Sequence, residues 1–313
     1  MKILITGAAG FIGYHTAKHF LEKKHKVYGY DTFNDYYDVH LKYDRFGQLV
    51  NMGLVNTGSF AGAIESIIED VQPDVVIHLA AYAGVRYSLE HPDKYIENNI
   101  VFTQRLIKAC EENKVDRVIY ASTSSVMAGN PLPWKEDDPT YQALNPYSGS
   151  KKFNETQFIT SKIPSTVGLR FFTVYGPWGR PDMALFSFTK DIIEGKPITV
   201  FNNGDMTRDF TYVDDIVHGI SLVTSEVLKG PMNEIYNIGR GEKVQLMRFV
   251  EEIEKNVGKK AIIQFAPMHP ADSQETWSDT SKLKKLGYDP KVSIEEGVEN
   301  FVNWYKEYYE VKL

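Results

Sequence analysis

The chain has 313 residues, of which 42% are hydrophobic and 24% are charged, an ordinary balance for a globular protein. Its formal net charge is −6 and no block of lysines and arginines stands out, which argues against a nucleic-acid surface. One cysteine, Cys110, excludes an internal disulfide and a thiolate metal cluster, and no stretch is long enough to span a bilayer, so we expect a cytoplasmic protein without a metal site.

Short apolar strands alternate with helices along the first half of the chain. The expected strands are Lys2–Thr6, Lys26–Tyr30, Asp74–Leu79, Arg117–Ala121 and Thr166–Phe171. The expected helices are Phe11–Leu21, one within Asn34–Gly53, Tyr95–Asn113 and Tyr147–Lys162. This alternation predicts an α/β fold with a doubly wound parallel sheet.

Beyond Tyr175 the regular alternation of strands and helices ends. Proline and glycine separate short elements there, at Pro177, Gly179, Pro181, Gly195, Pro197 and Gly204. We therefore expect residues 1–175 to form the sheet domain and residues 176–313 to form mainly a smaller α/β substrate lobe. Segments near 208–240, such as Glu234–Ile238, are expected to return to the main sheet.

A glycine-rich turn joins the first strand to the first helix. Gly7, Gly10 and Gly13 permit a tight turn and a close approach to a pyrophosphate, and the helix opening with Phe11 and Ile12 presents free N–H groups. Asp31 ends the second strand, where its carboxylate can accept a hydrogen bond from a ribose 2′-OH and would repel a 2′-phosphate. Although glycine is common in turns without a ligand, strand, turn, helix and acid together predict a Rossmann-like site for NAD.

A tyrosine and a lysine, Tyr147 and Lys151, stand four residues apart and share one face of a predicted helix. A nearby ammonium and an oxidised nicotinamide would favour the phenolate, which makes the tyrosine a usable base. Alone, this spacing is more typical of a solvated helix face. The hydroxyl-rich run 121–126 (ASTSSV) follows an apolar strand, where a parallel sheet binds ligands, and its hydroxyls could bridge the tyrosine and a substrate.

Together these features resemble the extended short-chain dehydrogenase/reductases that modify nucleotide sugars. The resemblance spans nearly the whole chain and is closest to the UDP-glucuronate 4-epimerases. The strings that carry it are His78–Ala81, Asn34–Asp38, Ala83–Ser88, Arg170–Ala184 and Arg208–Asp215, in addition to the glycine turn and the Tyr147/Lys151 pair.

The resemblance implies an isomerase that converts UDP-glucuronate to UDP-galacturonate through a transient 4-keto sugar. Tyr147, assisted by Thr123, would remove the C4 hydroxyl proton, and NAD would take and return the C4 hydride. Lys151 would hold the nicotinamide ribose. Further cofactor contacts are implied for Ser59, Leu79, Ala80, Ala81 and Asn99.

The implied intermediate is a β-keto acid, so the substrate carboxylate must be held away from the geometry that releases CO₂. By resemblance, Thr173, Ser124, Ser125 and Arg180 would grip the substrate there. Arg180 could also serve as a charge partner near the UDP, since an arginine fork matches carboxylates and phosphates equally well. Arg208 would bind the diphosphate, while Asp209 would serve local structure. Arg86 and Asp272 complete the implied substrate site.

Two positions in the hydroxyl loop separate this chain from related enzymes. Related 4,6-dehydratases carry Asp-Glu after the threonine and decarboxylases carry a glutamate, whereas this chain has Ser124 and Ser125. Elimination needs a positioned acid and base, which two hydroxyls do not supply. Other departures are Met127–Gly129 in place of Tyr-Gly, Ser59 in place of an aspartate that contacts adenine, and Met268–Asp272 in place of a Pro-Gly-Asp pattern.

Two alternatives stay open at this stage. One is the same reaction on UDP-glucose or a UDP-N-acetylhexosamine, and the other is a catalytically silent dinucleotide sensor on this fold. The resemblance also implies a homodimer in which Tyr95–Asn113 and Tyr147–Lys162 pack against their copies.

Overall fold

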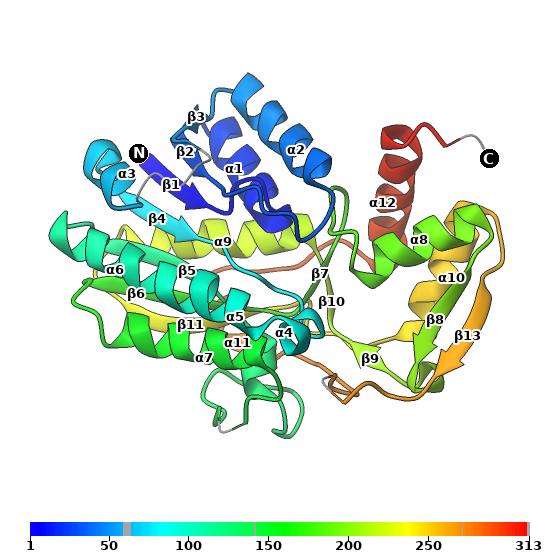
Figure 1. Cartoon of the computed structure of the whole chain (residues 1–313). Helices are drawn as coiled ribbons and strands as arrows, with labels where there is room; N and C mark the ends of the chain where they lie inside the picture. The colour runs from blue at the N-terminus through cyan, green and yellow to red at the C-terminus, as the bar shows by residue number, and fades with distance from the viewer. Residues whose placement is uncertain (59–63, 141, 271, 312–313) are drawn as a thin grey trace.

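A computed structural model describes residues 1–58, 64–140, 142–270 and 272–311, and a parallel sheet forms its centre (Figure 1). Within this described part, seven strands pair in the order β11-β6-β5-β4-β1-β2-β3. They are β1 (Lys2–Thr6), β2 (Lys26–Tyr30), β3 (Val55–Asn56), β4 (Val75–His78), β5 (Arg117–Thr123), β6 (Ser165–Phe171) and β11 (Asn233–Ile238). The predicted α/β fold with a doubly wound parallel sheet is confirmed.

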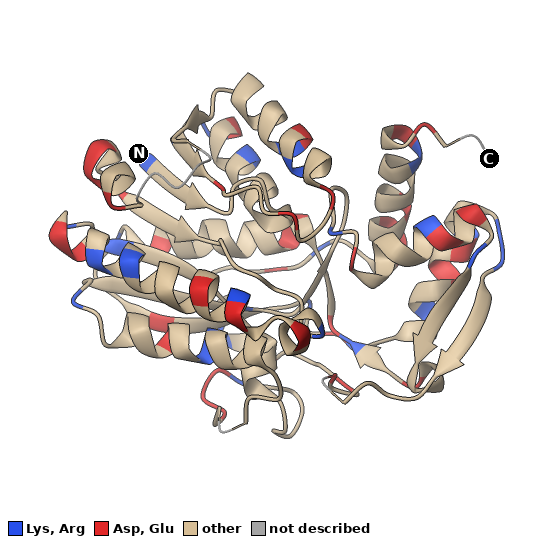
Figure 2. Cartoon of the chain, viewed as in Figure 1, with Lys and Arg blue, Asp and Glu red and all other residues tan. Residues whose placement is uncertain are grey.

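Side chains alternate between the two faces of the sheet, as the period of a strand requires. Ile3 and Ile5 of β1 belong to one buried cluster, and Leu4 belongs to another on the opposite face. The first cluster is covered by α1 (Phe11–Glu22), α2 (Val39–Asn51) and α9 (Val213–Val227). The second is covered by α3 (Ile64–Val71), α6 (Phe102–Glu112) and α7 (Pro146–Ile159). The strands between these layers carry few charged residues (Figure 2).

Helix boundaries follow local capping signals. The helix expected within Asn34–Gly53 begins only at Val39, because the side chain of Asp38 accepts a hydrogen bond from the His40 N–H. Helix α7 begins one residue before Tyr147, with Asn145 as its cap and Pro146 in its first turn.

The helix expected from Tyr95 to Asn113 is present, but its first part is π-helical. The chain is helical without a break through α5 (Pro92–Tyr95), a π-helix (Ile96–Val101) and α6, and a short helix, α4 (Tyr87–Glu90), precedes them. A π-helix is closed by hydrogen bonds between residues five apart and is frequent at functional sites.

The second half builds a smaller lobe beside the sheet (Figure 1). Its elements are α8 (Ala184–Glu194), β8 (Pro197–Phe201), β9 (Thr207–Arg208), β12 (Val244–Gln245), α10 (Leu246–Val257), β13 (Ile262–Ala266) and α12 (Ile294–Tyr308), with a short 3₁₀ turn at Asn202–Gly204. Further elements outside the main sheet are β7 (Thr173–Tyr175), β10 (Phe210–Tyr212), a 3₁₀ turn at Ser124–Met127 that follows β5, and α11 (Ser281–Lys284), which contacts β11. Strand β8 pairs with β13, β9 with β12, and β10 with β7. The expected return to the main sheet takes place at β11, which pairs in parallel with β6.

Candidate active site

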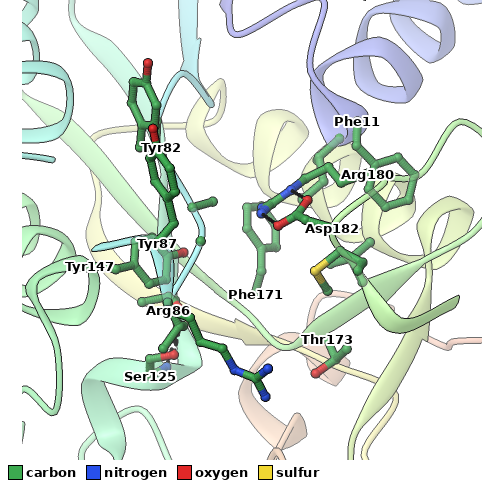
Figure 3. Close-up of a pocket in the computed structure, with 18 of the residues that line it drawn as sticks. Phe11, Tyr82, Arg86, Tyr87, Ser125, Tyr147, Phe171, Thr173, Arg180 and Asp182 are labelled. Atoms are coloured by element: carbon green, nitrogen blue, oxygen red, sulfur yellow. Dashed lines mark hydrogen bonds and ion pairs between the residues drawn. The ribbon is translucent and has the colours of Figure 1, made fainter. Parts of the chain in front are cut away.

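A cavity of about 860 Å³ lies where the carboxyl ends of the sheet strands face the second lobe. Residues that follow β1, β2, β4, β5 and β6 all contribute to its wall, as expected for a ligand site of a parallel sheet. Figure 3 shows Tyr147 and Ser125 on one side, with Arg180, Asp182 and Thr173 across from them.

The glycine turn forms a closely packed cradle at one end of the cavity. Gly7 has φ +77°, and a Cβ atom added to Gly13 would lie 1.9 Å from the Gly7 carbonyl oxygen, so neither position tolerates a side chain. Gly10 caps α1 without a side-chain hydrogen bond, which leaves the first N–H groups of the helix for a ligand. Gly7, Gly10, Phe11, Ile12 and Gly13 all line the cavity. This arrangement fits a pyrophosphate.

Asp31 lines the cavity beside this turn and is buried. Its carboxylate accepts hydrogen bonds from the Ala9 N–H at 3.0 Å and the Phe33 N–H at 2.9 Å. Burial raises the pKa of Asp31, against the effect of the Phe33 N–H and the nearby Lys42 ammonium. A carboxylate fixed in this way fits a ribose diol, so the site suits NAD.

Lys42 is a cavity residue that the sequence did not reveal. Its Nζ donates to the Asn34 side chain at 2.7 Å, and burial lowers its pKa to about 8. A lysine on an amphipathic helix carries no sequence signal that distinguishes it from its exposed neighbours, so only the tertiary structure reveals its position.

The remaining cofactor candidates divide into three groups. Leu79, Ala80 and Ala81 line the cavity. Asn99 does not line it: this residue of the π-helix is fully buried, and its amide bonds the backbone N–H and carbonyl of Tyr82 at 2.9 and 3.0 Å. It therefore shapes the loop that follows β4. Ser59 lies outside the described residues.

The proposed base and its lysine partner share the cavity-facing side of α7, and both are buried. Burial raises the pKa of Tyr147, while a hydrogen bond with Thr123 and the charge of Arg180 lower it. The Nζ of Lys151 donates to the Ala121 carbonyl at 3.0 Å, and burial lowers the pKa of Lys151 to about 8. Among the cations of the chain itself, the one that lowers the pKa of Tyr147 is therefore Arg180, whereas the sequence predicted this effect for Lys151.

A buried ion pair supports the hydroxyl loop from behind. Arg170 of β6 binds both carboxylate oxygens of Glu155 at 2.8 and 2.9 Å, and Ser122 donates to the same carboxylate at 2.6 Å. Glu155 lies one helical turn after Lys151, so the network joins α7 to β5 and β6 at Ser122, the residue before Thr123. Thr123, Ser124 and Ser125 line the cavity.

Arg180 faces this wall from a loop of the second half. Its guanidinium forms a fork with the carboxylate of Asp182 at 2.5 and 3.0 Å, and Tyr36 donates to that carboxylate at 2.9 Å. Thr173, at the start of β7, lines the cavity nearby. The pairing with Asp182 was not apparent from the sequence, although only Pro181 stands between the partners.

A second basic group lies farther along the cavity. Arg86 pairs with Asp272 at 2.7 Å and its guanidinium stands 3.9 Å from the centre of the Phe201 ring. Arg208 donates to the carbonyls of Thr207 and Gln274, and burial lowers its pKa. Two arginines with one carboxylate fit a diphosphate. Asp209 points elsewhere and bonds Ser278 and the Arg240 N–H, so its expected structural role is confirmed.

The departure at 127–129 changes one edge of the cavity. Met127 is fully buried against Val126, Trp134 and Phe172, whereas Ala128 lines the cavity. The chain therefore presents a methyl group at this edge.

Comparison with known families agrees with the geometry. Residues 3–239 match the NAD dependent epimerase/dehydratase family. The chain belongs to this family. A UDP-glucuronate 4-epimerase of Thermodesulfobacterium geofontis is 41% identical over 98% of the chain and 97% of its own length.

Solved structures of other epimerase/dehydratase proteins share the fold over their full length. A UDP-glucuronic acid 4-epimerase from Bacillus cereus, solved with UDP-glucuronic acid and NAD, has a TM-score of 0.90 and 36% identity, covering 99% of this chain and 100% of that one. A UDP-glucose 4-epimerase from Thermotoga maritima has a TM-score of 0.86 and 25% identity, covering 99% of this chain and 100% of that one.

In the described part of the chain, no helix of this epimerase/dehydratase has the length and apolarity needed to cross a membrane. No group of three or more His, Cys, Asp and Glu side chains there could hold a metal ion.

Proposed function

We propose that the chain is an NAD-dependent UDP-glucuronate 4-epimerase, an isomerase that interconverts UDP-glucuronate and UDP-galacturonate. The observation that carries this proposal is a buried tyrosine, Tyr147, facing an arginine, Arg180, across a cavity that contains the glycine turn. A base opposite a cation suits a sugar that must lose a proton at C4 and carries a carboxylate at C5. The relatives from T. geofontis and B. cereus support the same substrate.

NAD, held by Gly7, Gly10, Gly13 and Asp31, would supply the acceptor and donor of the C4 hydride. The chain supplies the proton chemistry. Tyr147 takes the C4 hydroxyl proton, and the Thr123 hydrogen bond and the Arg180 charge stabilise its phenolate against the effect of burial. Lys151, fixed by the Ala121 carbonyl, orients the ribose beside this oxygen.

The second task of the site is to keep the carboxylate on the sugar. Arg180 and Thr173 bind it from one side, and the hydroxyls of Ser124 and Ser125 bind from the other. None of these four side chains is a carboxylic acid that could protonate a leaving group, so elimination of water is not supported. Arg86 and Arg208 bind the diphosphate, with Asp272 as their counter-charge.

Purified protein incubated separately with UDP-glucuronate, UDP-glucose and UDP-N-acetylglucosamine tests the proposal. We expect interconversion of UDP-glucuronate and UDP-galacturonate at a kcat/KM at least about a hundredfold above that for the neutral sugars, because a neutral sugar offers no charged acceptor for the hydrogen bonds of Arg180 and Thr173. Conversion of UDP-glucose without turnover of UDP-glucuronate would instead identify a neutral-sugar epimerase. NAD binding without turnover of any of the three would identify a sensor.

We further propose that the protein is cytoplasmic and forms a homodimer. Residues 1–175, with segments near 208–240, would bind NAD, and the lobe of residues 176–313 would mainly bind the nucleotide sugar. Exposed apolar side chains on the π-helix and on α7 support the dimer: Ile96, Val101, Phe153 and Ile159 are 39–64% exposed. Light scattering should give twice the mass of the chain, and a Phe153→Glu/Ile159→Glu variant should give the mass of one chain.

A further inference from the structure

Arg45 of α2 is a buried cation held by three separate segments of the chain. Its side chain is fully buried. One terminal nitrogen, Nη1, donates to the Ala9 carbonyl at 3.0 Å and to the Tyr37 hydroxyl at 2.7 Å. The other, Nη2, donates to the carbonyls of Trp178 and Gly179 at 2.6 and 3.0 Å.

All four acceptors are uncharged, which is unusual for a buried arginine. A buried cation normally pairs with a carboxylate, because removal of its hydration shell is otherwise expensive. Among the described residues Arg45 forms no ion pair, and its Nε is buried without a hydrogen-bond partner. Stability alone therefore does not explain why an arginine stands here.

The two ends of this contact belong to opposite sides of the cavity. Ala9 lies inside the glycine turn, between Gly7 and Gly10. Gly179 directly precedes Arg180, the cation that faces Tyr147. One planar guanidinium thus fixes the distance between the cofactor turn and the loop that carries Arg180.

The Arg180 loop depends on such a support. Trp178 has φ +61°, a backbone conformation that is energetically unfavourable for any residue that carries a side chain. Its ring packs against Tyr14, Trp304 and Tyr308. Arg45 binds its carbonyl from the other side, so the loop is held both at its ring and at its backbone.

We propose that Arg45 is a positioning residue that sets the location of Arg180 relative to the cofactor turn, and thereby keeps the substrate carboxylate in place. The inference rests on the proposed function. Arg45 does not line the cavity and acts only through Ala9, Tyr37 and the Arg180 loop. A lysine has one nitrogen and cannot bridge the same acceptors in a fixed plane.

The chemistry of the intermediate provides a specific readout. If the carboxylate of the 4-keto sugar is free to rotate, the C5–C6 bond breaks and its electron pair passes into the C4 ketone as an enolate. CO₂ then leaves, and a proton from water adds at C5 to give a UDP-4-keto-pentose, while the two electrons removed from C4 remain with the NAD that accepted them. Misplacement of Arg180 should therefore raise the ratio of CO₂ to UDP-galacturonate, whereas simple loss of folded protein lowers both products equally.

The test compares Arg45→Lys and Arg45→Met with Ile68→Ala, a control that removes a fully buried side chain from α3, away from the cavity. We expect the ratio of CO₂ to UDP-galacturonate to rise at least about tenfold in Arg45→Lys, and further in Arg45→Met, since small misplacements at a reacting centre are costly. Binding of UDP-glucuronate measured by calorimetry should weaken in parallel. The product ratio of Ile68→Ala should match that of the unmodified chain at equal loss of melting temperature.

A double-mutant cycle decides whether Arg45 acts through Arg180. Once Arg180→Ala has been introduced, Arg45→Lys should change the product ratio by less than about twofold, because the two residues work as one unit. An unchanged ratio in Arg45→Lys alone, or independent effects of the two substitutions, would overturn the inference. If Arg45→Met does not fold, Arg45→Lys still carries the test. Failure of the proposed function is distinct, because the unmodified chain itself would not turn over UDP-glucuronate.

Discussion

The two sides of the cavity are built in different ways. Tyr147, Lys151 and Thr123 stand on a regular helix and strand, are buried, and rest on the Glu155–Arg170 ion pair. The arginines opposite, Arg86, Arg180 and Arg208, stand on loops and a two-residue strand and are partly exposed. Two of them are paired with aspartates, Asp272 and Asp182.

This difference follows from what each side does. Proton transfer depends on a fixed distance, so its groups are embedded in the sheet and its helix. Recognition of an anionic nucleotide sugar depends on charge, and an arginine with a carboxylate partner keeps its charge balanced while remaining near the cavity. We therefore expect substitutions on the side of Tyr147, the catalytic side, to lower kcat. Substitutions on the side of the three arginines, the recognition side, should raise KM.

Removal of the phenol oxygen of Tyr147 should have the largest effect. The Tyr147→Phe variant should lower kcat by about 10³-fold or more, since general base catalysis contributes about 10² to 10⁴. KM and the content of bound NAD should change by less than about threefold, because the ring and Lys151 remain in place. Product analysis by chromatography and absorbance of the released nucleotide measure the two quantities.

Tyr95→Phe is the matched control for this substitution. Tyr95 is buried next to Tyr147, with 6.2 Å between their ring centres, and its hydroxyl bonds the Gly84 carbonyl at 2.5 Å. Its loss should lower kcat by less than about tenfold, the range of one ordinary hydrogen bond. Equal losses in both variants would remove Tyr147 from the role of base.

Substitution of Arg208 tests the recognition side. Arg208→Met should raise KM by about 30- to 100-fold, the range of a hydrogen bond to a charged group, with kcat within about threefold of the unmodified value. Arg248→Met, which removes an exposed arginine from α10, should leave both parameters unchanged. A fall in kcat without a rise in KM would show that the two sides do not divide the work in this way.

The same contrast explains which features could be predicted from the sequence. Tyr147, Lys151 and Thr123 follow from the period of a helix and the end of a strand, which fix where side chains point. Glu155, Lys42 and Arg45 could not be found in this way, because their partners lie on other elements and no local pattern relates them. The π-helical geometry of Ile96–Val101, within the expected Tyr95–Asn113 helix, likewise had no sequence signal, and this segment carries Asn99, which bonds Tyr82.

The smallest effect expected concerns stability on the catalytic side. Burial lowers the pKa of Lys151 to about 8, below its value near 10.4 in an unfolded chain. The unfolded state therefore binds the proton more tightly, so the buried ammonium lowers the free energy of unfolding at pH 7 by about 3 kcal/mol, and this cost disappears as the pH rises from 8 to 10.4. Lys151→Met removes the cost but leaves the Ala121 carbonyl without its donor, which costs about 1–2 kcal/mol.

Lys151→Met should thus be more stable than the unmodified chain at pH 7, by about 1–2 kcal/mol, while losing turnover. The advantage should shrink at pH 9.5, because there the unmodified chain buries a neutral amine and has regained most of the lost stability. Urea unfolding at both pH values, on protein freed of NAD, measures the difference. The prediction would be contradicted by a Lys151→Met variant that is less stable than the unmodified chain at pH 7, or by a stability difference that does not depend on pH. Either result would mean that burial of the Lys151 ammonium does not lower the free energy of unfolding.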